Sequence, residues 1–281
     1  MIQKILVPTD LSSLGDYAYQ MAHRIAKSTG AEIVLLNVMA LPSGAVLDRE
    51  GKIKDDDEMD HSSFFAEEAE ISTNLKEYIK DKPDIATTKV VIGSVNEEIL
   101  KYMKGQDIDL VIMGTHGASG LSEKIIGSHA DKIIRKASVP VITLKCDRSD
   151  YDINDILFAS DFESKEPTNL EPVLTIAKAF NADIHLLKIN TPKNFKPNRA
   201  IKEKMIEFAD ENHLEAKEIK MHIYCDESVE QGILNFSAES GVDFVALATS
   251  RKKGLARLFH ENISVDVVNH NFQPVMTFPI Q

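Results

Sequence analysis

Short, continuous apolar runs alternate along this chain with longer segments of helical period. Residues 33–38 are one such run, of the kind that is buried on both faces of a parallel sheet. Residues 16–28 have helical period, with one apolar face made by Tyr17, Met21, Ile25 and Ala26. Parallel strands need right-handed helical crossovers. The pattern therefore predicts βαβ units and a doubly wound α/β fold.

The pattern occurs twice, so the chain is an internal duplication. At an offset of 151 residues, 4–10 match 155–161 and 31–38 match 182–189. At an offset of 134 residues, 109–113 match 243–247 and 140–143 match 274–277. We expect two tandem domains, 1–146 and 152–281, joined by the polar residues 147–150. Each should supply about five strands and four helices.

The change of offset places 17 extra residues in the first copy, and residues 41–63 are the best candidates for them. This stretch contains Pro42, Gly44 and Gly51, so we expect a mobile loop or lid. Its acidic cluster, residues 55–58, has two interpretations. The cluster could bind a divalent cation, or it could be a solvated charged loop, which is the favoured interpretation.

Glycines follow the strand-like residues 110–113. The run Gly114-Thr115-His116-Gly117 is followed, after nine residues, by Gly127-Ser128. Glycines let main-chain NH groups approach an anion, and Ser128 stands where a new helix would begin. The spacing is neither that of the common phosphate loop nor GxGxxG. It predicts a phosphate-binding loop, while an ordinary turn followed by a helix cap is the structural alternative.

The spacing resembles the G-2x-G-9x-G-(S/T) signature of the ATP-binding branch of the universal stress protein family. Three flanking segments extend the resemblance: Val7-Pro8-Thr9-Asp10, Asn37-Val38, and Val139-Pro140-Val141. The resemblance implies two tandem five-stranded parallel-sheet sandwiches, Rossmann-like and of the adenine nucleotide alpha hydrolase-like type. It also implies ATP as ligand, with ADP or AMP as alternatives, and a magnesium ion near Asp10.

The resemblance assigns roles to individual residues of the first copy. Asp10 would accept hydrogen bonds from adenine or ribose, Pro8 and Thr9 would shape the wall, and Val38 would lie against adenine. The remaining expected nucleotide contacts follow the later strand: Met113, Gly114, His116, Gly117, Gly127, Ser128 and His129. His116 is also a weaker candidate for acid–base work. We assign no catalytic residue, because no lysine or arginine is placed to stabilise a transferring phosphoryl group.

The second copy acts as an internal control for this motif. Gly114, Gly117, Gly127 and Ser128 correspond there to Ala248, Arg251, Glu261 and Asn262. The fold therefore does not require glycine at these positions. A carboxylate at Glu261 would repel phosphate, so we expect no ATP site of this kind in the second copy. The basic residues Arg251, Lys252, Lys253 and Arg257 suggest another anion, an acidic partner or, as the favoured reading, solvent exposure.

Composition narrows the class of protein. The 281 residues, 43% of them hydrophobic, are enough for two packed cores. A net charge of -12 and a pI of about 5.2 argue against binding to nucleic acid or anionic membranes. Cys146 and Cys225 have no metal-ligand spacing and are expected to be plain thiols. Without an apolar run of eighteen residues or a leader pattern, we expect a soluble, cytoplasmic protein.

Two functions remain after these observations. The first is a nucleotide-responsive stress or regulatory module with at most slow hydrolysis and an unidentified protein partner. The alternative is an ATP hydrolase, or a phosphoryl or adenylyl transferase, that acts on an unidentified acceptor. A scaffold stabilised by nucleotide is a minor third reading. The resemblance further implies that the last strands, residues 141–145 and 275–278, pair edge to edge, and it leaves further homodimerisation open.

Overall fold

The structure is a computed structural model of the whole chain. It describes nine stretches of residues: 2–41, 62–80, 86–115, 128–146, 152–163, 170–214, 219–249, 261–271 and 273–279. Two predicted segments, the linker 147–150 and the basic residues 251–257, lie outside these stretches, as do residues 42–61 of the expected loop.

Strands and helices alternate through both copies. The first copy contains β1 Lys4–Pro8, α1 Ser13–Thr29, β2 Glu32–Met39, α2 Ser62–Tyr78, β3 Ala86–Ile92, α3 Val95–Gly105, β4 Leu110–Gly114, α4 Ser128–Lys136 and β5 Val141–Leu144. The second contains β6 Asp155–Ala159, α5 Glu171–Phe180, β7 Asp183–Asn190, the 3₁₀ turn η1 Pro192–Asn194, α6 Asn198–Glu211, β8 Ile219–Cys225, α7 Val229–Ser240, β9 Phe244–Thr249, α8 Glu261–His270 and β10 Val275–Pro279.

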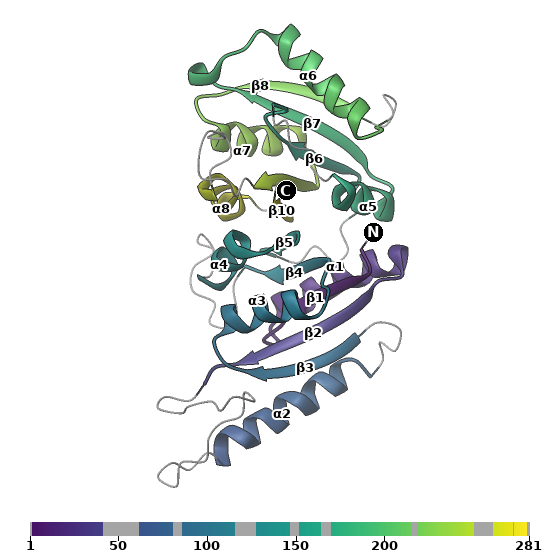
Figure 1. The fold of residues 1–281 in the computed structure, drawn as a ribbon, viewed down its shortest axis with the longest axis vertical. Helices are drawn as coiled ribbons and strands as arrows, with labels where there is room; N and C mark the ends of the chain where they lie inside the picture. The colour runs from purple at the N-terminus through teal and green to yellow at the C-terminus, as the bar shows by residue number, and fades with distance from the viewer. Residues whose placement is uncertain are drawn as a thin grey trace.

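All ten of these strands belong to one sheet, in the order β3-β2-β1-β4-β5-β10-β9-β6-β7-β8 (Figure 1). Pairing within each copy is parallel, which confirms the doubly wound prediction. The copies join through β5 and β10, which pair antiparallel with Ile142 opposite Met276. The expected pairing of the last strands is therefore confirmed, and each strand covers the other's edge.

The helices of both copies cover the two faces of this sheet in the same way. One apolar core contains buried residues of α1, α2, α5 and α6, and the opposite core contains buried residues of α3, α4, α7 and α8. Both cores run through the two copies. The strands between them are apolar on both faces because helices cover both faces, as the continuous apolar runs predicted.

Helix α1 begins earlier than the periodicity predicted. The Ser12 side chain accepts a hydrogen bond from the Gly15 amide, and this cap starts the helix at Ser13 instead of near residue 16. Gly30 ends the helix with φ of 76°, a left-handed conformation that suits glycine. Helix α1 therefore lies against the sheet with its first turn close to the carboxyl end of β1.

Candidate functional site

The predicted site residues follow the two strands where the sheet changes direction. Strand β1 lies between β2 and β4. The chain leaves β1 toward one face of the sheet, into α1, and leaves β4 toward the other face, into α4. In doubly wound folds, ligands bind outside the carboxyl ends of the strands at such a switch point. Asp10 follows β1, and Thr115 follows β4. The fold thus brings the two predicted segments, about a hundred residues apart in sequence, to one edge.

Local hydrogen bonds fix the turn after β1. The Leu11 amide donates to Thr9 Oγ1 over 3.0 Å, and the Ser12 amide donates to Asp10 Oδ1 over 3.1 Å. These bonds hold Leu11 in the left-handed region, with φ of 60°. Its side chain remains 37% exposed. The turn therefore places Asp10 and an exposed apolar side chain at the carboxyl edge of β1.

Gly15 allows this turn to pack on the start of α1. A Cβ atom on Gly15 would lie 2.5 Å from Thr9 Oγ1, which is closer than real Cβ contacts. The Thr9 hydroxyl already accepts a hydrogen bond from the Leu11 amide, so the turn fixes the position of this hydroxyl. A glycine is therefore required where the first turn of α1 passes Thr9.

Asn37 lies beside the turn that holds Asp10, and the sequence analysis treated it only as the end of a strand. Its side chain is 7% exposed, and its Nδ2 donates to the Thr9 carbonyl over 2.9 Å. The buried Oδ1 of the same amide has no hydrogen-bond donor among the described residues. An unsatisfied buried acceptor is costly. A ligand NH group that reached this corner of the crevice would satisfy it.

The other predicted positions that the structure describes also lie along this edge. Val38 is half-buried in β2, and Met113 and Gly114 end β4. The Thr115 amide donates to the Leu144 carbonyl, which continues the ladder to β5 one residue beyond β4. His116, Gly117 and Gly127 lie outside the described residues, so their contacts with a ligand stay predictions.

Helix α4 begins at Ser128, where the sequence placed a helix start. The next residue, His129, is exposed, and its Nδ1 lies 3.1 Å from Oδ1 of Asn96 in α3. The buried Asn96 amide therefore orients the imidazole between two helix N-termini that face the same edge of the sheet. This contact was not predicted, because Asn96 carries no motif signal.

The second copy builds the same turn but fills the space above it. The Phe162 amide donates to Ser160 Oγ and the Glu163 amide to Asp161 Oδ1, and Phe162 has φ of 58°. Phe162 is only 7% exposed, because its ring packs 6.2 Å from that of Phe158 and 5.2 Å from that of Phe208. An aromatic cluster thus covers this turn, whereas Leu11, at the equivalent position of the first copy, is 37% exposed.

Lys188 occupies the position of Asn37 in the second copy. It is 6% exposed, and burial lowers its pKa although Asp161 and Glu163 act in the opposite direction. Glu163 also pairs with Lys196 over 2.6 Å. An amine that donates hydrogen bonds thus stands where the first copy has an amide oxygen that accepts them. The two copies therefore differ in hydrogen-bonding chemistry at this position.

The described residues at the carboxyl edge of the first copy carry little charge that could hold a metal ion. Within the described stretches, no group of three or more His, Cys, Asp or Glu side chains could hold a metal ion. Asp10 is the one predicted site carboxylate, and it is exposed. Nor does any helix of the described part of the chain have the length and apolarity needed to cross a membrane.

Fold and crevice together define a tandem doubly wound α/β protein with its candidate site at the switch point of the first copy. The model of the universal stress protein family matches residues 1–145 and again 153–279. The chain belongs to the universal stress protein family, and it carries two copies of the family's domain in tandem.

Individual relatives agree with this assignment. Universal stress protein MJ0577 of Methanocaldococcus jannaschii is 28% identical over 155 residues, which cover 52% of this chain and 96% of that protein. Universal stress protein YxiE of Bacillus subtilis is 30% identical over 152 residues, covering 52% of this chain and all of YxiE. A crystal structure of a universal stress protein from Archaeoglobus fulgidus matches 99% of this chain and 98% of its own, with a TM-score of 0.73 at 20% identity. The tandem fold is therefore shared over its full length.

Proposed function

We propose that the first copy binds one adenine nucleotide, with ATP as the ligand and magnesium near Asp10, and that the second copy does not. The protein would then be a cytoplasmic, nucleotide-responsive stress or regulatory module with at most slow hydrolysis. Its nucleotide-binding domain would span residues 1–146, and the domain with the degenerate motif residues 152–281.

The observation that carries this proposal is the unsatisfied Oδ1 of Asn37 beside the turn that holds Asp10. Adenine has an exocyclic amino group that donates hydrogen bonds, and Asn37 Oδ1 is a buried acceptor that needs a donor. Pro8, Thr9 and Val38 would hold the base and ribose from the β1 and β2 side of the crevice. Such a pairing would favour adenine over a base that offers only a carbonyl there.

The phosphates would lie along the loop that follows β4. Gly114, Gly117 and Gly127 would let main-chain amides approach them, and the first amides of α4 at Ser128 and His129 would add the positive end of the helix dipole. Magnesium would supply charge neutralisation of the phosphates. Because no cationic side chain is assigned to the transferring phosphate, binding is better supported than turnover.

The test is the nucleotide content of freshly purified protein, measured by ion-exchange chromatography after denaturation. We expect about one adenine nucleotide per chain, and its loss in Gly127→Glu, which copies Glu261 into the first copy. The matched control, Glu261→Gly, should leave the content unchanged.

Two results would change the proposal. If the wild-type protein carries no nucleotide and added ATP does not bind, the glycine loop is only a turn. If phosphate is released over many turnovers well above the blank, the alternative of a hydrolase or transferase is favoured instead.

A further inference from the structure

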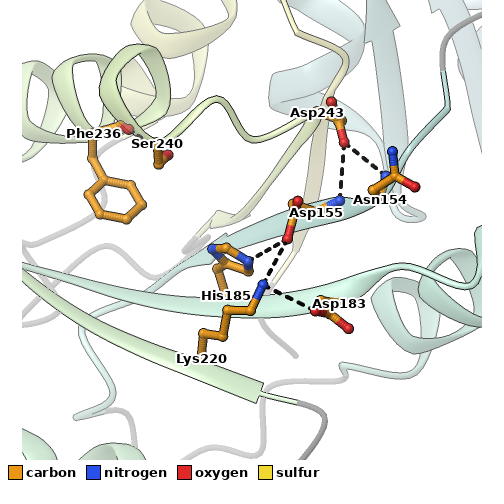
Figure 2. Close-up of polar contacts among 8 residues, drawn as sticks. All are labelled: Asn154, Asp155, Asp183, His185, Lys220, Phe236, Ser240 and Asp243. Carbon is orange, nitrogen blue, oxygen red and sulfur yellow. Dashed lines mark hydrogen bonds and ion pairs between the residues drawn. The ribbon is translucent and has the colours of Figure 1, made fainter.

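The amino ends of β6, β7 and β8 carry a polar cluster on the edge of the sheet opposite the crevices. Figure 2 shows Asp155, His185 and Lys220 pointing toward one another, with Asp183 and Asp243 beside them. Lys220 Nζ lies 3.2 Å from Asp155 Oδ1 and 3.1 Å from Asp183 Oδ2. The three carboxylates outnumber the one ammonium, so the cluster favours a further cation.

His185 is a buried imidazole at a position where the fold needs only an apolar side chain. It is 7% exposed, and its counterpart in the first copy is the buried Val34. On the adjacent strand, His222 lies in register with Leu187, where the first copy pairs Lys89 with Leu36. Both imidazoles are thus peculiar to the second copy and are not required by the shared architecture.

Asp155 fixes the tautomer of His185. Burial by itself would raise the pKa of Asp155, but hydrogen bonds from Lys220 and His185 hold it below its usual value. Asp155 is therefore an ionised acceptor, so His185 Nε2, 2.7 Å from Oδ1, carries the proton and donates. The other ring nitrogen, Nδ1, lies on the side of the ring away from Asp155 (Figure 2).

The two imidazoles each carry a buried nitrogen that lacks a partner. His185 Nδ1 and His222 Nε2 have no hydrogen bond within the described part of the chain. Burial lowers the pKa of His222, and the neighbouring His185 and Lys220 lower it further. Imidazole nitrogens that lack a hydrogen-bond partner are ligands suited to Zn²⁺, Ni²⁺ or Cu²⁺.

The spacing of the rings matches a shared metal ion. Their centroids are 5.1 Å apart, and their planes are inclined to one another by 26°. With metal–nitrogen bonds of about 2.0 Å and a tetrahedral angle, two ligating imidazoles have centroids roughly 5 Å apart. A carboxylate that orients a ligating histidine, as Asp155 orients His185, is the usual support of such a site. We propose that His185 and His222 bind one divalent transition-metal ion, Zn²⁺ foremost, with Asp155 orienting His185 and water completing the coordination.

The His222 ring belongs to the last strand of the sheet. His222 is half-buried on β8, the edge strand of the sheet, and its ring packs 4.9 Å from that of Phe236 in α7. Since only two protein ligands are available, positions remain free on the metal for water or for an external donor. The site would therefore respond to metal availability without being a closed structural zinc site.

Zn²⁺ titration of the full, untagged chain with a competing chromophoric chelator tests this proposal. We expect one equivalent to bind with micromolar affinity. His185→Val and His222→Lys, which copy Val34 and Lys89, should each weaken binding at least tenfold, and Asp155→Asn by about tenfold. The exposed His270→Gln and Cys225→Ser are the matched controls and should bind Zn²⁺ as the wild type does.

Thermal melting separates lost binding from lost folding. Zn²⁺ should raise the melting temperature of the wild type, since it binds the native state, and should not raise that of His185→Val. If His185→Val is unfolded, the half-buried His222→Lys carries the test. Absence of bound Zn²⁺ in the wild type, or equal affinity in the wild type and in both histidine variants, would overturn the proposal and leave a buried water as the partner of the two nitrogens.

Discussion

The two copies differ at the carboxyl edge of their first strands, although the turn there is the same. Thr9 and Asp10 cap their turn as Ser160 and Asp161 cap theirs, and the next residue is left-handed in both. Above the turn, Leu11 is exposed in the first copy, whereas in the second the equivalent Phe162 is buried against two other phenylalanine rings.

This comparison separates the needs of the fold from the needs of a ligand. The fold requires the turn, because both copies make it. It does not require an exposed side chain after Asp10, an unsatisfied acceptor or glycines after the fourth strand, because the second copy lacks the counterparts of all three. The features that only the first copy has are therefore the best guide to where a ligand binds.

The largest expected effect comes from emptying the aromatic cluster of the second copy. Phe208→Ala removes the ring that packs 5.5 Å from Phe158 and 5.2 Å from Phe162. We expect a loss of about 3–5 kcal/mol in the free energy of unfolding, measured by urea denaturation. Nucleotide binding by the first copy should persist under native conditions. A loss below about 1 kcal/mol would show that the cluster does not stabilise the second copy.

Exchange of Asn37 and Lys188 tests whether the acceptor in the first crevice matters. Asn37→Lys replaces the unsatisfied oxygen with a cationic donor, so we expect adenine nucleotide to bind roughly thirtyfold more weakly, about 2 kcal/mol. Isothermal titration with ATP measures this change. Lys188→Asn is the control and should leave the affinity as it is. Equal affinities in wild type and Asn37→Lys would remove Asn37 from the site.

A tyrosine links the helix that follows the second strand of the first copy to α1. In the first, the hydroxyl of Tyr78 on α2 donates to Asp16 of α1, and burial together with this bond raises the pKa of Tyr78. Tyr78→Phe should lower the free energy of unfolding by about 1–2 kcal/mol, because a hydrogen bond to a carboxylate is lost. Urea denaturation provides the measurement. A change within about 0.3 kcal/mol would mean that apolar contacts alone hold α2.

The smallest expected effect is a change in the pH dependence of stability at Lys188. Burial lowers its folded-state pKa below the usual 10.5, so in the window between the two values the unfolded chain binds more protons. Stability contributed by this group therefore rises with pH across that window. Lys188→Met should remove the rise in urea denaturation series up to about pH 10.5, whereas the exposed control Lys193→Met should keep it. An unchanged slope in Lys188→Met would contradict the assignment.

Much of the fold was predictable from local patterns. The duplication, the alternation of strands and helices, the start of α4 and the pairing of the last strands all agree with the structure. The early start of α1 was not predicted, because the Ser12 cap acts through a single hydrogen bond that leaves no apolar period. Residues 16–28 gave only the part of the helix that packs on the core.

The site was predictable where it depends on glycine spacing and on strand ends, and not where it depends on side-chain partners. Asp10, Val38 and Gly114 were placed by motif, while their roles toward a nucleotide stay predictions. Asn37 and Asn96 were missed as partners, since a single asparagine carries no signal until a neighbour 28 or 33 residues away is known. The same holds for His185 and His222, which lie 37 positions apart in the sequence and in adjacent strands of the sheet.

The sequence by itself determined the tandem α/β architecture and the loss of the glycine motif in the second copy, because both follow from the periodicity and type of residues along the chain. Only the tertiary structure decided which of Leu11 and Phe162 is buried, which buried amide keeps an unused oxygen, and which two imidazoles lie side by side. These depend on contacts between residues far apart in sequence, which packing brings together and no local pattern encodes.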